Sequence, residues 1–383
     1  MELIHSVFNS FWGGLLLMVI CSIIIAKACD IFEASTDYLG RNLSDGVKGA
    51  TLNAIASSMP ELLTTAFFLI LASKEELGRG LAAGIGGNTG SAIFNSIVIP
   101  ILVILVVILS GKGIKEIKID KKVVLRDGLF LIVGEVLLIV LVSDDVISQW
   151  HGWAFTLFYI IYLAYTLFTM KKTPGNNENG IIEGDQQQSS WFLKYLYSKK
   201  SRRGLRSWNL LIIATLIIAV ACAGLVEGCN GISYSLGINP LIIALVLVAA
   251  ASSVPDAIIS MKDARKGNYE DAISNVLGSN IFDISISMGL PLAIFLLVTD
   301  QEIYFGEAGA SLIDIRIILL AVTIISVGIF YFAKSLTKRH ALYLTILYVV
   351  FILYSIGSAS FSAGGDNVLA QGVKAIKEFL MAV

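Results

Sequence analysis

Two short stretches place a carboxylate directly after a proline inside a long apolar run. They are Ser57-Ser58-Met59-Pro60-Glu61 and Ser252-Ser253-Val254-Pro255-Asp256. Proline has no N–H to donate to the carbonyl four residues earlier, so it kinks a helix where it stands. In the first stretch Ser57 and Glu61 are four residues apart and share one helix face, with Ser58 beside them. Because hydroxyl and carboxylate oxygens are the ligands that hard cations prefer, this pattern predicts a cation site.

A second motif also occurs twice, once after each of these stretches. The two copies are Gly90-Ser91-Ala92-Ile93-Phe94-Asn95 and Gly278-Ser279-Asn280-Ile281-Phe282-Asp283. In each copy the serine and the final Asn or Asp are four residues apart, so both face the same side of a helix. Two motifs that recur in the same order indicate an internal duplication, which is typical of membrane transporters.

The composition predicts a helical membrane protein that crosses the bilayer many times. The chain has 383 residues, is 56% hydrophobic and has a mean hydropathy of +0.79, which excludes an ordinary soluble protein. An ionised carboxylate at the centre of a bilayer costs about 3 kcal/mol or more, so Glu61, Asp256 and Asp283 are candidate functional residues. The three histidines are scattered and the four cysteines have no metal-binding spacing. We therefore expect no enzyme activity and no cofactor.

The apolar runs predict about ten transmembrane helices. They fall near residues 8–29, 48–73, 80–109, 123–143, 150–170, 208–231, 238–261, 269–298, 312–333 and 341–361. A polar segment at 171–207, rich in Asn, Gln, Ser and Gly, separates the first five spans from the last five. Its composition is typical of a disordered linker. We thus divide the chain into a first half at 1–170 with motifs at 50–100, the linker, and a second half at 208–383 with motifs at 245–291.

Lysine and arginine alternate between the connections. The basic connections contain Arg41 and Lys48; Lys112, Lys115, Lys118, Lys121 and Lys122; the linker; Lys262, Arg265 and Lys266; and Lys334, Lys338 and Arg339. The opposite connections contain only Lys74 and Arg79. The positive-inside rule places the basic set and the linker in the cytoplasm, and both termini outside. The localisation that we expect is the plasma (inner) membrane.

This orientation makes the two halves inverted copies of each other. The span with Glu61 runs from inside to outside, whereas the span with Asp256 runs from outside to inside. We therefore expect an all-α polytopic membrane protein with about ten transmembrane helices in two inverted-topology repeats of five. Inverted repeats with broken helices that meet near the midplane are typical of secondary transporters.

The paired motifs resemble the two α-repeats of the cation/calcium exchangers. The first repeat corresponds to 57–61 with 90–95, and the second to 252–256 with Ser274-Asn275-Val276-Leu277-Gly278-Ser279-Asn280-Ile281-Phe282-Asp283. The residues of these motifs are most similar to those of the potassium-dependent sodium/calcium branch, which also has Glu in repeat one and Asp in repeat two. The resemblance implies a set of ion ligands: Glu61, Asp256, Asp283, Asn95, Ser57, Ser252, Ser58, Ser253, Ser91, Ser279 and the carbonyls of Ala54 and Ala249. Positions 57 and 252 are serine where many members have threonine.

The resemblance implies exchange of calcium for sodium, with inorganic cations and the lipid bilayer as the partners. Two alternatives remain open: a proton/calcium exchanger, because a proton can also neutralise a carboxylate, and a cation channel. Asp283 adds a charge that its repeat partner Asn95 lacks, and potassium, a proton or an additional sodium ion could neutralise it. Glu135 and Glu227 lie outside the repeats, and we expect each to pair or to reach the interface. The sequence indicates no nucleic-acid partner and no obligate protein partner.

Overall fold

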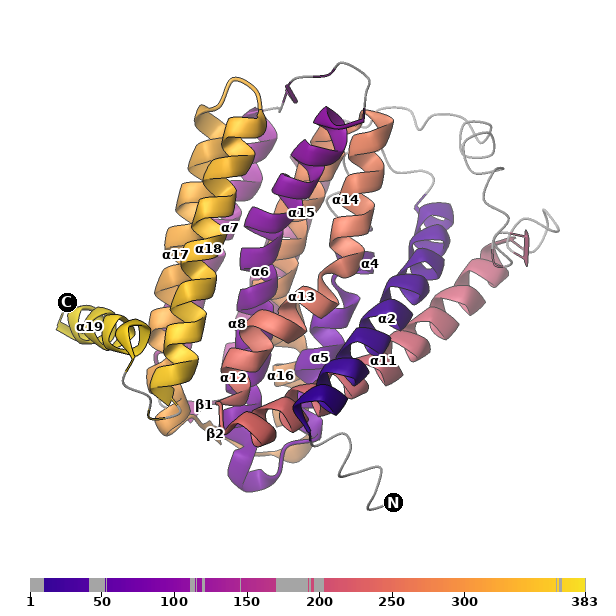
Figure 1. Cartoon of the computed structure of the whole chain (residues 1–383). Coiled ribbons are helices and arrows are strands. Elements are labelled where there is room, and N and C mark those ends of the chain that lie inside the picture. The colour runs from indigo at the N-terminus through magenta and orange to yellow at the C-terminus, as the bar shows by residue number, and fades with distance from the viewer. Residues whose placement is uncertain are drawn as a thin grey trace.

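The protein is described by a computed structural model (Figure 1). It describes residues 10–40, 52, 54–110, 114, 116–118, 121–144, 146–169, 192, 194–195, 203–362, 364 and 367–382. The helices of the first half are α2 (Phe11–Leu39), α4 (Ala54–Ser57), α5 (Met59–Ile70), η2 (Lys74–Glu76), α6 (Leu77–Ile108), α7 (Lys121–Leu141) and α8 (Gln149–Thr169). Those of the second half are α11 (Arg203–Leu236), α12 (Pro240–Ile243), the π-helical turn η4 (Ala244–Val248), α13 (Ala249–Ser252), α14 (Val254–Lys266), α15 (Tyr269–Ile284), α16 (Ile286–Thr299), α17 (Glu307–Phe332), α18 (Lys338–Ser362) and α19 (Val368–Ala382).

Seven of the described helices are long and apolar enough to cross a bilayer. Residues Pro240–Ser252 and Val254–Lys266, which meet at a bend of 40°, make an eighth span if the two segments are counted together. Two of the ten expected spans are not among these. Helix α5 has only 12 residues, and α7 contains the charged residues Arg126, Asp127 and Glu135. The chain is therefore a multi-pass helical membrane protein, and the count of ten remains a prediction.

Both proline-containing stretches interrupt a helix at the second serine. Helix α4 ends before Ser58 and α5 begins after it, while Ser253 separates α13 from α14 in the same way. The backbone angles are similar at the two breaks, with φ −95° and ψ 8° at Ser58 and φ −80° and ψ 2° at Ser253. In Figure 1 the chain descends from α4 to α5 but rises from α13 to α14, so the two broken helices run in opposite directions.

The two longest expected spans, the third and the eighth, differ from each other. The third expected span is one continuous helix, α6, which contains Pro100. The eighth is divided at Ser285 into α15 and α16. Glycines let α6 approach the second broken helix closely, since a Cβ added at Gly90 would lie 1.9 Å from the carbonyl oxygen of Leu245. Thus α6 packs directly against a helix from the other half of the chain.

Helices α2 and α11 pack side by side along one flank of the bundle (Figure 1). Gly14 and Gly228 lie at their contact, where a Cβ on Gly14 would be 2.7 Å from the carbonyl oxygen of Gly228. Both helices extend past the ranges that the sequence predicts, with 29 residues in α2 and 34 in α11. Because α11 begins at Arg203, the last five residues of the expected linker are helical. Residues 171–191 of the linker lie outside the described residues.

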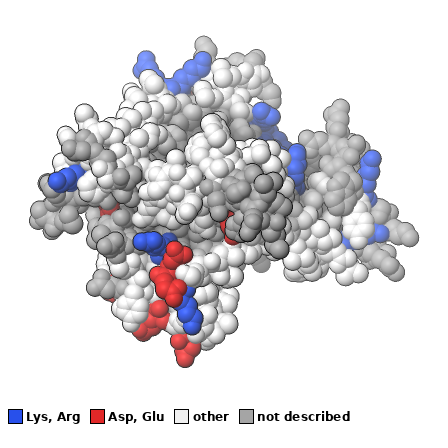
Figure 2. All heavy atoms as spheres, turned by 60° about the horizontal axis from the view of Figure 1, so that its bottom comes forward, with Lys and Arg blue, Asp and Glu red and all other residues white. Residues whose placement is uncertain are grey.

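Acidic residues occupy the end of the molecule that is lowest in Figure 1. Figure 2 turns this end forward and shows Asp and Glu gathered there with few Lys and Arg. The exposed acidic residues in its described connections are Glu75, Glu76, Asp144, Asp300 and Glu302. At the same end, strand β1 (Val146–Ile147) pairs antiparallel with β2 (Ile303–Tyr304) and joins the two halves. The uneven charge agrees with the alternation of basic connections in the sequence.

Candidate cation site

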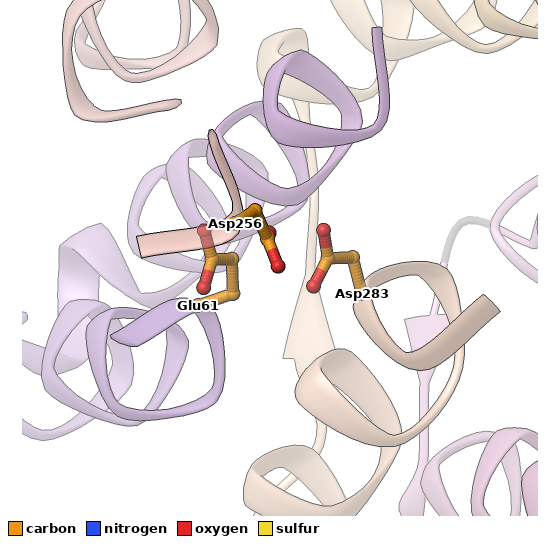
Figure 3. Close-up of side chains that lie close together, drawn as sticks. All are labelled: Glu61, Asp256 and Asp283. Atoms are coloured by element: carbon orange, nitrogen blue, oxygen red, sulfur yellow. The ribbon is translucent and has the colours of Figure 1, made fainter. Parts of the chain in front are cut away.

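Three carboxylates from three helices meet in the interior of the bundle. Glu61 comes from α5, Asp256 from α14 and Asp283 from α15. Each is at most 1% exposed, and one oxygen of each lies within 4.8 Å of the other two (Figure 3). The side chains point toward one another, which repels when all three are ionised. Among the described residues, this group could hold a cation.

Asp256 is the carboxylate with the most complete hydrogen bonding. Asn95 donates from Nδ2 to its Oδ2 at 3.0 Å, and Ser279 donates from Oγ to its Oδ1 at 2.8 Å. Asn95 belongs to α6 in the first half, whereas Asp256 and Ser279 belong to the second. The site is therefore assembled across the two halves.

Glu61 and Asp283 both lie within hydrogen-bond distance of the hydroxyl of Ser91. The Oγ of Ser91 lies 3.2 Å from Oε1 of Glu61 and 2.8 Å from Oδ2 of Asp283. It also lies 2.8 Å from the Oγ of Ser253. Because a serine hydroxyl has one proton, Ser91 can donate to only one of the two carboxylates at a time.

Several polar atoms at the site are unpaired, and most of them are acceptors; the Oγ of Ser58 is also buried without a hydrogen-bond partner. Oε2 of Glu61, Oδ1 of Asp283 and Oδ1 of Asn95 are buried without a hydrogen-bond partner. The ion pairs among the described residues involve other acidic groups, namely Asp127, Asp144, Asp30 and Glu33. Buried charges that lack a counter-ion are costly, so bound cations or protons must neutralise these carboxylates. The all-oxygen set suits a hard cation such as calcium or sodium.

The remaining expected ligands lie at the two helix breaks. Ser57 and Ser252 are buried, and each donates from Oγ to the carbonyl three residues earlier at 3.3 Å. Ser57 also lies 3.4 Å from the Oγ of Ser279. Ser58 and Ser253 occupy the breaks and are fully buried. The structure thus brings the serines of both stretches to the carboxylates, and their role as ligands stays a prediction.

The two carbonyls that the resemblance implies as ligands are already hydrogen-bonded. The oxygen of Ala54 accepts from the N–H of Ser58 at 3.0 Å, and that of Ala249 accepts from the N–H of Ser253 at 3.0 Å. Each also accepts the serine hydroxyl described above. A carbonyl oxygen has two lone pairs, so either carbonyl would have to exchange a hydrogen bond in order to bind an ion.

Two residues of α2, which no sequence motif indicates, support the breaks. Pro60 and Pro255 leave the carbonyls of Ala56 and Ala251 without their usual helical donor. Ser22 donates from Oγ to the oxygen of Ala251 at 2.9 Å, and Cys29 donates from Sγ to that of Ala56 at 3.8 Å. The sequence does indicate which carbonyls need a donor, because a proline leaves the carbonyl four residues before it without its helical hydrogen bond. The donor comes from a distant helix, which the sequence does not specify.

The two glutamates outside the repeats have different surroundings. Glu135 is fully buried on α7 and accepts a hydrogen bond from Thr323 of α17 at 2.6 Å, while its Oε2 has no partner. Glu227 is exposed on α11. Neither belongs to the group of three carboxylates.

Comparison with known proteins places the chain beside ion exchangers. The family model described as sodium/calcium exchanger protein matches residues 13–168 and 206–357. Sodium/potassium/calcium exchanger 3 of Homo sapiens is 32% identical over 191 residues, which are 48% of this chain and 30% of that protein. The aligned part is thus less than a third of that relative. An uncharacterized membrane protein of Methanocaldococcus jannaschii is 26% identical over 265 residues, 68% of this chain and 76% of that one.

Two solved structures share the fold. The H+/Ca2+ exchanger CAX has a TM-score of 0.70 at 15% identity, covering 96% of this chain and 89% of that chain. The sodium-calcium exchanger NCX_Mj has a TM-score of 0.56 at 23% identity, covering 92% and 98%. At identities this low, the comparison shows a shared arrangement of helices and does not extend to function.

Proposed function

Because this chain belongs to the sodium/calcium exchanger protein family, we propose that it is a secondary active antiporter that exchanges calcium for sodium. The observation that supports this most is the group formed by Glu61, Asp256 and Asp283, buried on broken helices without a basic partner among the described residues. The proposal includes no enzymatic step and no resident cofactor. Its substrates are inorganic cations.

Charge balance explains why such a site would exchange ions. Three ionised carboxylates leave an empty site with three negative charges, which is costly inside a bilayer. One calcium ion or several sodium ions would compensate most of this charge, and both require the same oxygens. The two kinds of ion therefore exclude each other. If the empty, charged site cannot switch from one side of the membrane to the other, the protein must bind an ion before each switch. Exchange of one kind of ion for the other is then obligatory.

We further propose that the ten expected spans form two inverted repeats with the linker in the cytoplasm of a plasma (inner) membrane. This is supported by the opposite directions of α4–α5 and α13–α14, and by the similar backbone angles at Ser58 and Ser253. The acidic end in Figure 2 would then face outward, together with both termini. No obligate protein partner is part of the proposal.

Helices α2 and α11 are the proposed moving elements in alternating access. They pack mainly on each other along the flank, and Ser22 and Cys29 of α2 contact the broken helices at their unpaired carbonyls. Displacement of α2 along the bundle would exchange these contacts while the carboxylates stay in place. Such a movement would open the site to one side at a time.

A second candidate is exchange of calcium for protons. It is favoured by the unpartnered oxygens Oε2 of Glu61 and Oδ1 of Asp283, because a carboxylic acid neutralises itself by binding a proton. A cation channel is less well supported, since channels usually line an axial pore with parallel elements, whereas these broken helices run in opposite directions.

Calcium uptake into proteoliposomes tests these candidates. Sodium, potassium and proton gradients are imposed separately on vesicles that contain the purified chain. We expect saturable calcium uptake that requires an opposing sodium gradient. Uptake that follows only the proton gradient would favour the second candidate, and unsaturable uptake without any counter-ion gradient would indicate a channel.

A further inference from the structure

Helix α2 carries a hydrogen-bond donor at every seventh position of one face: Ser22, Cys29 and Thr36. Seven residues make nearly two full turns, so these side chains lie almost in line along the helix, roughly 10 Å apart. Ser22 donates to the carbonyl of Ala251 and Cys29 to that of Ala56. Thr36 is buried one heptad further on and donates to two carbonyls of its own helix. The donors therefore have the same spacing as the two carbonyls that the prolines leave unpaired.

Helix α11 carries a matching heptad set: Thr215, Cys222 and Cys229. Cys222 and Cys229 donate from Sγ to the carbonyls of Pro60 and Pro240, each at 3.6 Å. Thr215 donates to a carbonyl of its own helix at 2.8 Å. Each of the two helices thus has a third donor one heptad beyond the two that contact the broken helices.

A displacement of α2 by one heptad toward its N-terminus would replace both donors at the breaks. Cys29 would then face the carbonyl of Ala251, and Thr36 would face that of Ala56. The opposite displacement would bring Leu15 to Ala251, and a shift by a single turn toward the N-terminus would bring an isoleucine or an alanine there. None of these side chains can donate a hydrogen bond. Of these steps, the heptad toward the N-terminus keeps both carbonyls paired.

The same step keeps the contacts of α11. Because α11 is antiparallel to α2, a movement of the pair in one direction shifts α11 toward its C-terminus (Figure 1). One heptad of this movement would bring Thr215 to the carbonyl of Pro60 and Cys222 to that of Pro240. The glycine contacts between α2 and α11 would be unchanged, since the two helices would move together.

The ion pair near the C-terminal end of α2 also has a replacement one heptad away. Lys262 of α14 lies 2.9 Å from Oδ1 of Asp30, and residue 37 is again an aspartate. The longer contact of 3.5 Å to Glu33 would be lost, because residue 40 is glycine. Lys262 would thus meet an aspartate in both arrangements.

We infer that Thr36, Asp37 and Thr215 are positioning residues for a second arrangement of α2 and α11, displaced by one heptad toward the acidic end of the molecule. Buried polar groups are nearly always hydrogen-bonded, so an arrangement that left the carbonyls of Ala56 and Ala251 unpaired would be costly. The heptad sets avoid this cost, because each carbonyl has a donor before and after the movement. The inference rests on the proposed alternating access and not on which ions the chain carries.

Double electron–electron resonance of the reconstituted full chain tests the displacement. Spin labels are attached at Trp12→Cys and Arg265→Cys, exposed positions at the start of α2 and near the end of α14, while the four native cysteines are buried. We expect two distances that differ by roughly 10 Å, in a ratio that changes between calcium, sodium and ion-free buffer. A single distance in all three buffers, or a difference of roughly 5 Å, which is one turn, would overturn the inference.

Two substitutions should shift the populations in opposite directions. Ser22 contacts Ala251 in the described arrangement and leaves it in the displaced one, so Ser22→Ala should raise the ratio of displaced to described molecules by roughly five-fold. Thr36→Val keeps the branched shape without the hydroxyl and should lower this ratio by roughly the same factor. The matched control is Ser35→Ala, since Ser35 is also buried and donates within α2 at 2.8 Å. Equal effects of Thr36→Val and the control, or a shift in the same direction for Ser22→Ala and Thr36→Val, would contradict the inference.

Calcium uptake by the same preparations separates this inference from the proposed function. Two distances without sodium-dependent uptake would support the displacement and reject the exchange of calcium for sodium. Sodium-dependent uptake with a single distance would support the exchange and reject the displacement by one heptad.

Discussion

At the scale of single residues, the three carboxylates of the site are not equivalent. Asp256 accepts hydrogen bonds at both oxygens, from Asn95 and Ser279. Glu61 and Asp283 share the hydroxyl of Ser91, and each retains an oxygen without a partner. The hydrogen bonds therefore compensate Asp256 best. Glu61 and Asp283 depend most on a bound cation or proton.

The first prediction concerns the two carboxylates that follow the prolines. Glu61→Gln and Asp256→Asn should each lower the rate of calcium transport by about a hundred-fold or more, because each removes the charge of a carboxylate proposed to hold the ion. Removing a buried charge should not impair insertion into the bilayer. Uptake into vesicles measures the rate, and size-exclusion chromatography with thermal unfolding checks the fold. Transport by either folded variant near the wild-type rate would contradict the site assignment.

The second prediction concerns Asp283, whose repeat partner Asn95 is neutral. If potassium compensates the additional charge, calcium uptake by the wild type should require potassium. Uptake by Asp283→Asn, which keeps the volume and removes the charge, should not require it. The measurement is calcium uptake with and without potassium on both sides of the vesicle. Wild-type uptake that is unchanged without potassium would reject this role and leave Asp283 to a proton or a sodium ion. The pH dependence of the wild type compared with the variant separates those two.

At the scale of elements, two features control how the helices meet. The broken helices depend on α2, whose Ser22 supplies a donor to the carbonyl that Pro255 leaves unpaired. They also depend on glycines in α6, which permit backbone contact with η4 and α13. Each feature can be altered by one substitution.

The third prediction concerns an ion pair between α2 and α14. Nζ of Lys262 lies 2.9 Å from Oδ1 of Asp30 and 3.5 Å from Oε2 of Glu33. These side chains are partly exposed, so Lys262→Gln should lower the free energy of unfolding by no more than about 1 kcal/mol. The C-terminal end of α2, the proposed moving helix, should nevertheless lose its attachment to α14.

Hydrogen exchange measures this release. Amides near the end of α2, in residues 30–39, should exchange several-fold faster in Lys262→Gln than in wild type. Asp30→Asn with Glu33→Gln should have the same effect, and the triple variant should add little to it. Lys334→Gln removes a charge from an exposed lysine after α17 and serves as the control. Equal exchange in all variants would show that the ion pair does not hold α2.

The fourth prediction concerns Gly90. The Cβ of an alanine there would lie 1.9 Å from the oxygen of Leu245 and 2.7 Å from the Cβ of Ala249. Because both are held in packed helices, Gly90→Ala should lower the free energy of unfolding by about 1–3 kcal/mol and displace the second broken helix. Gly87→Ala is a matched control, since its Cβ would meet only Val248 at 4.0 Å. Thermal unfolding of both variants tests this, and equal melting temperatures would refute the close contact.

At the scale of the whole molecule, the site exists only where the two halves meet. Asn95 of the first half donates to Asp256 of the second, and Ser91 of the first half contacts Asp283 and Ser253 of the second. The strand pair β1–β2 connects the halves again at the acidic end. Either half alone would lack part of the group, since Glu61 belongs to the first half and Asp256 and Asp283 belong to the second.

The fifth prediction tests that orientation. A cysteine introduced at Asn177 in the linker should resist an impermeant thiol reagent added outside intact cells, because the linker is expected in the cytoplasm. Glu75→Cys, at the exposed acidic end, should react rapidly in the same cells. The four native cysteines are buried and should contribute little labelling. Rapid labelling at position 177 would show that the linker lies outside the cell and that the proposed topology is wrong.

The sequence by itself determined the class of protein and most of the candidate site. Apolar runs predict membrane helices because the bilayer interior requires apolar side chains. The prolines predict breaks in these helices because every proline lacks the N–H that a helical hydrogen bond needs. The repeated motifs identified Glu61, Asp256 and Asp283, which the structure brings together. These features depend on residues that are near one another in the chain.

Only the tertiary structure decided which groups complete the site. Helix α6 stays continuous while its counterpart breaks at Ser285, although both expected spans are long and apolar. Ser22 and Cys29 of α2 supply donors to the carbonyls of Ala251 and Ala56, and Ser91 is shared between Glu61 and Asp283. The physical reason is that a buried polar group takes whichever partner packing brings within about 3 Å. That partner lies on another helix, and local sequence does not encode the distance between helices.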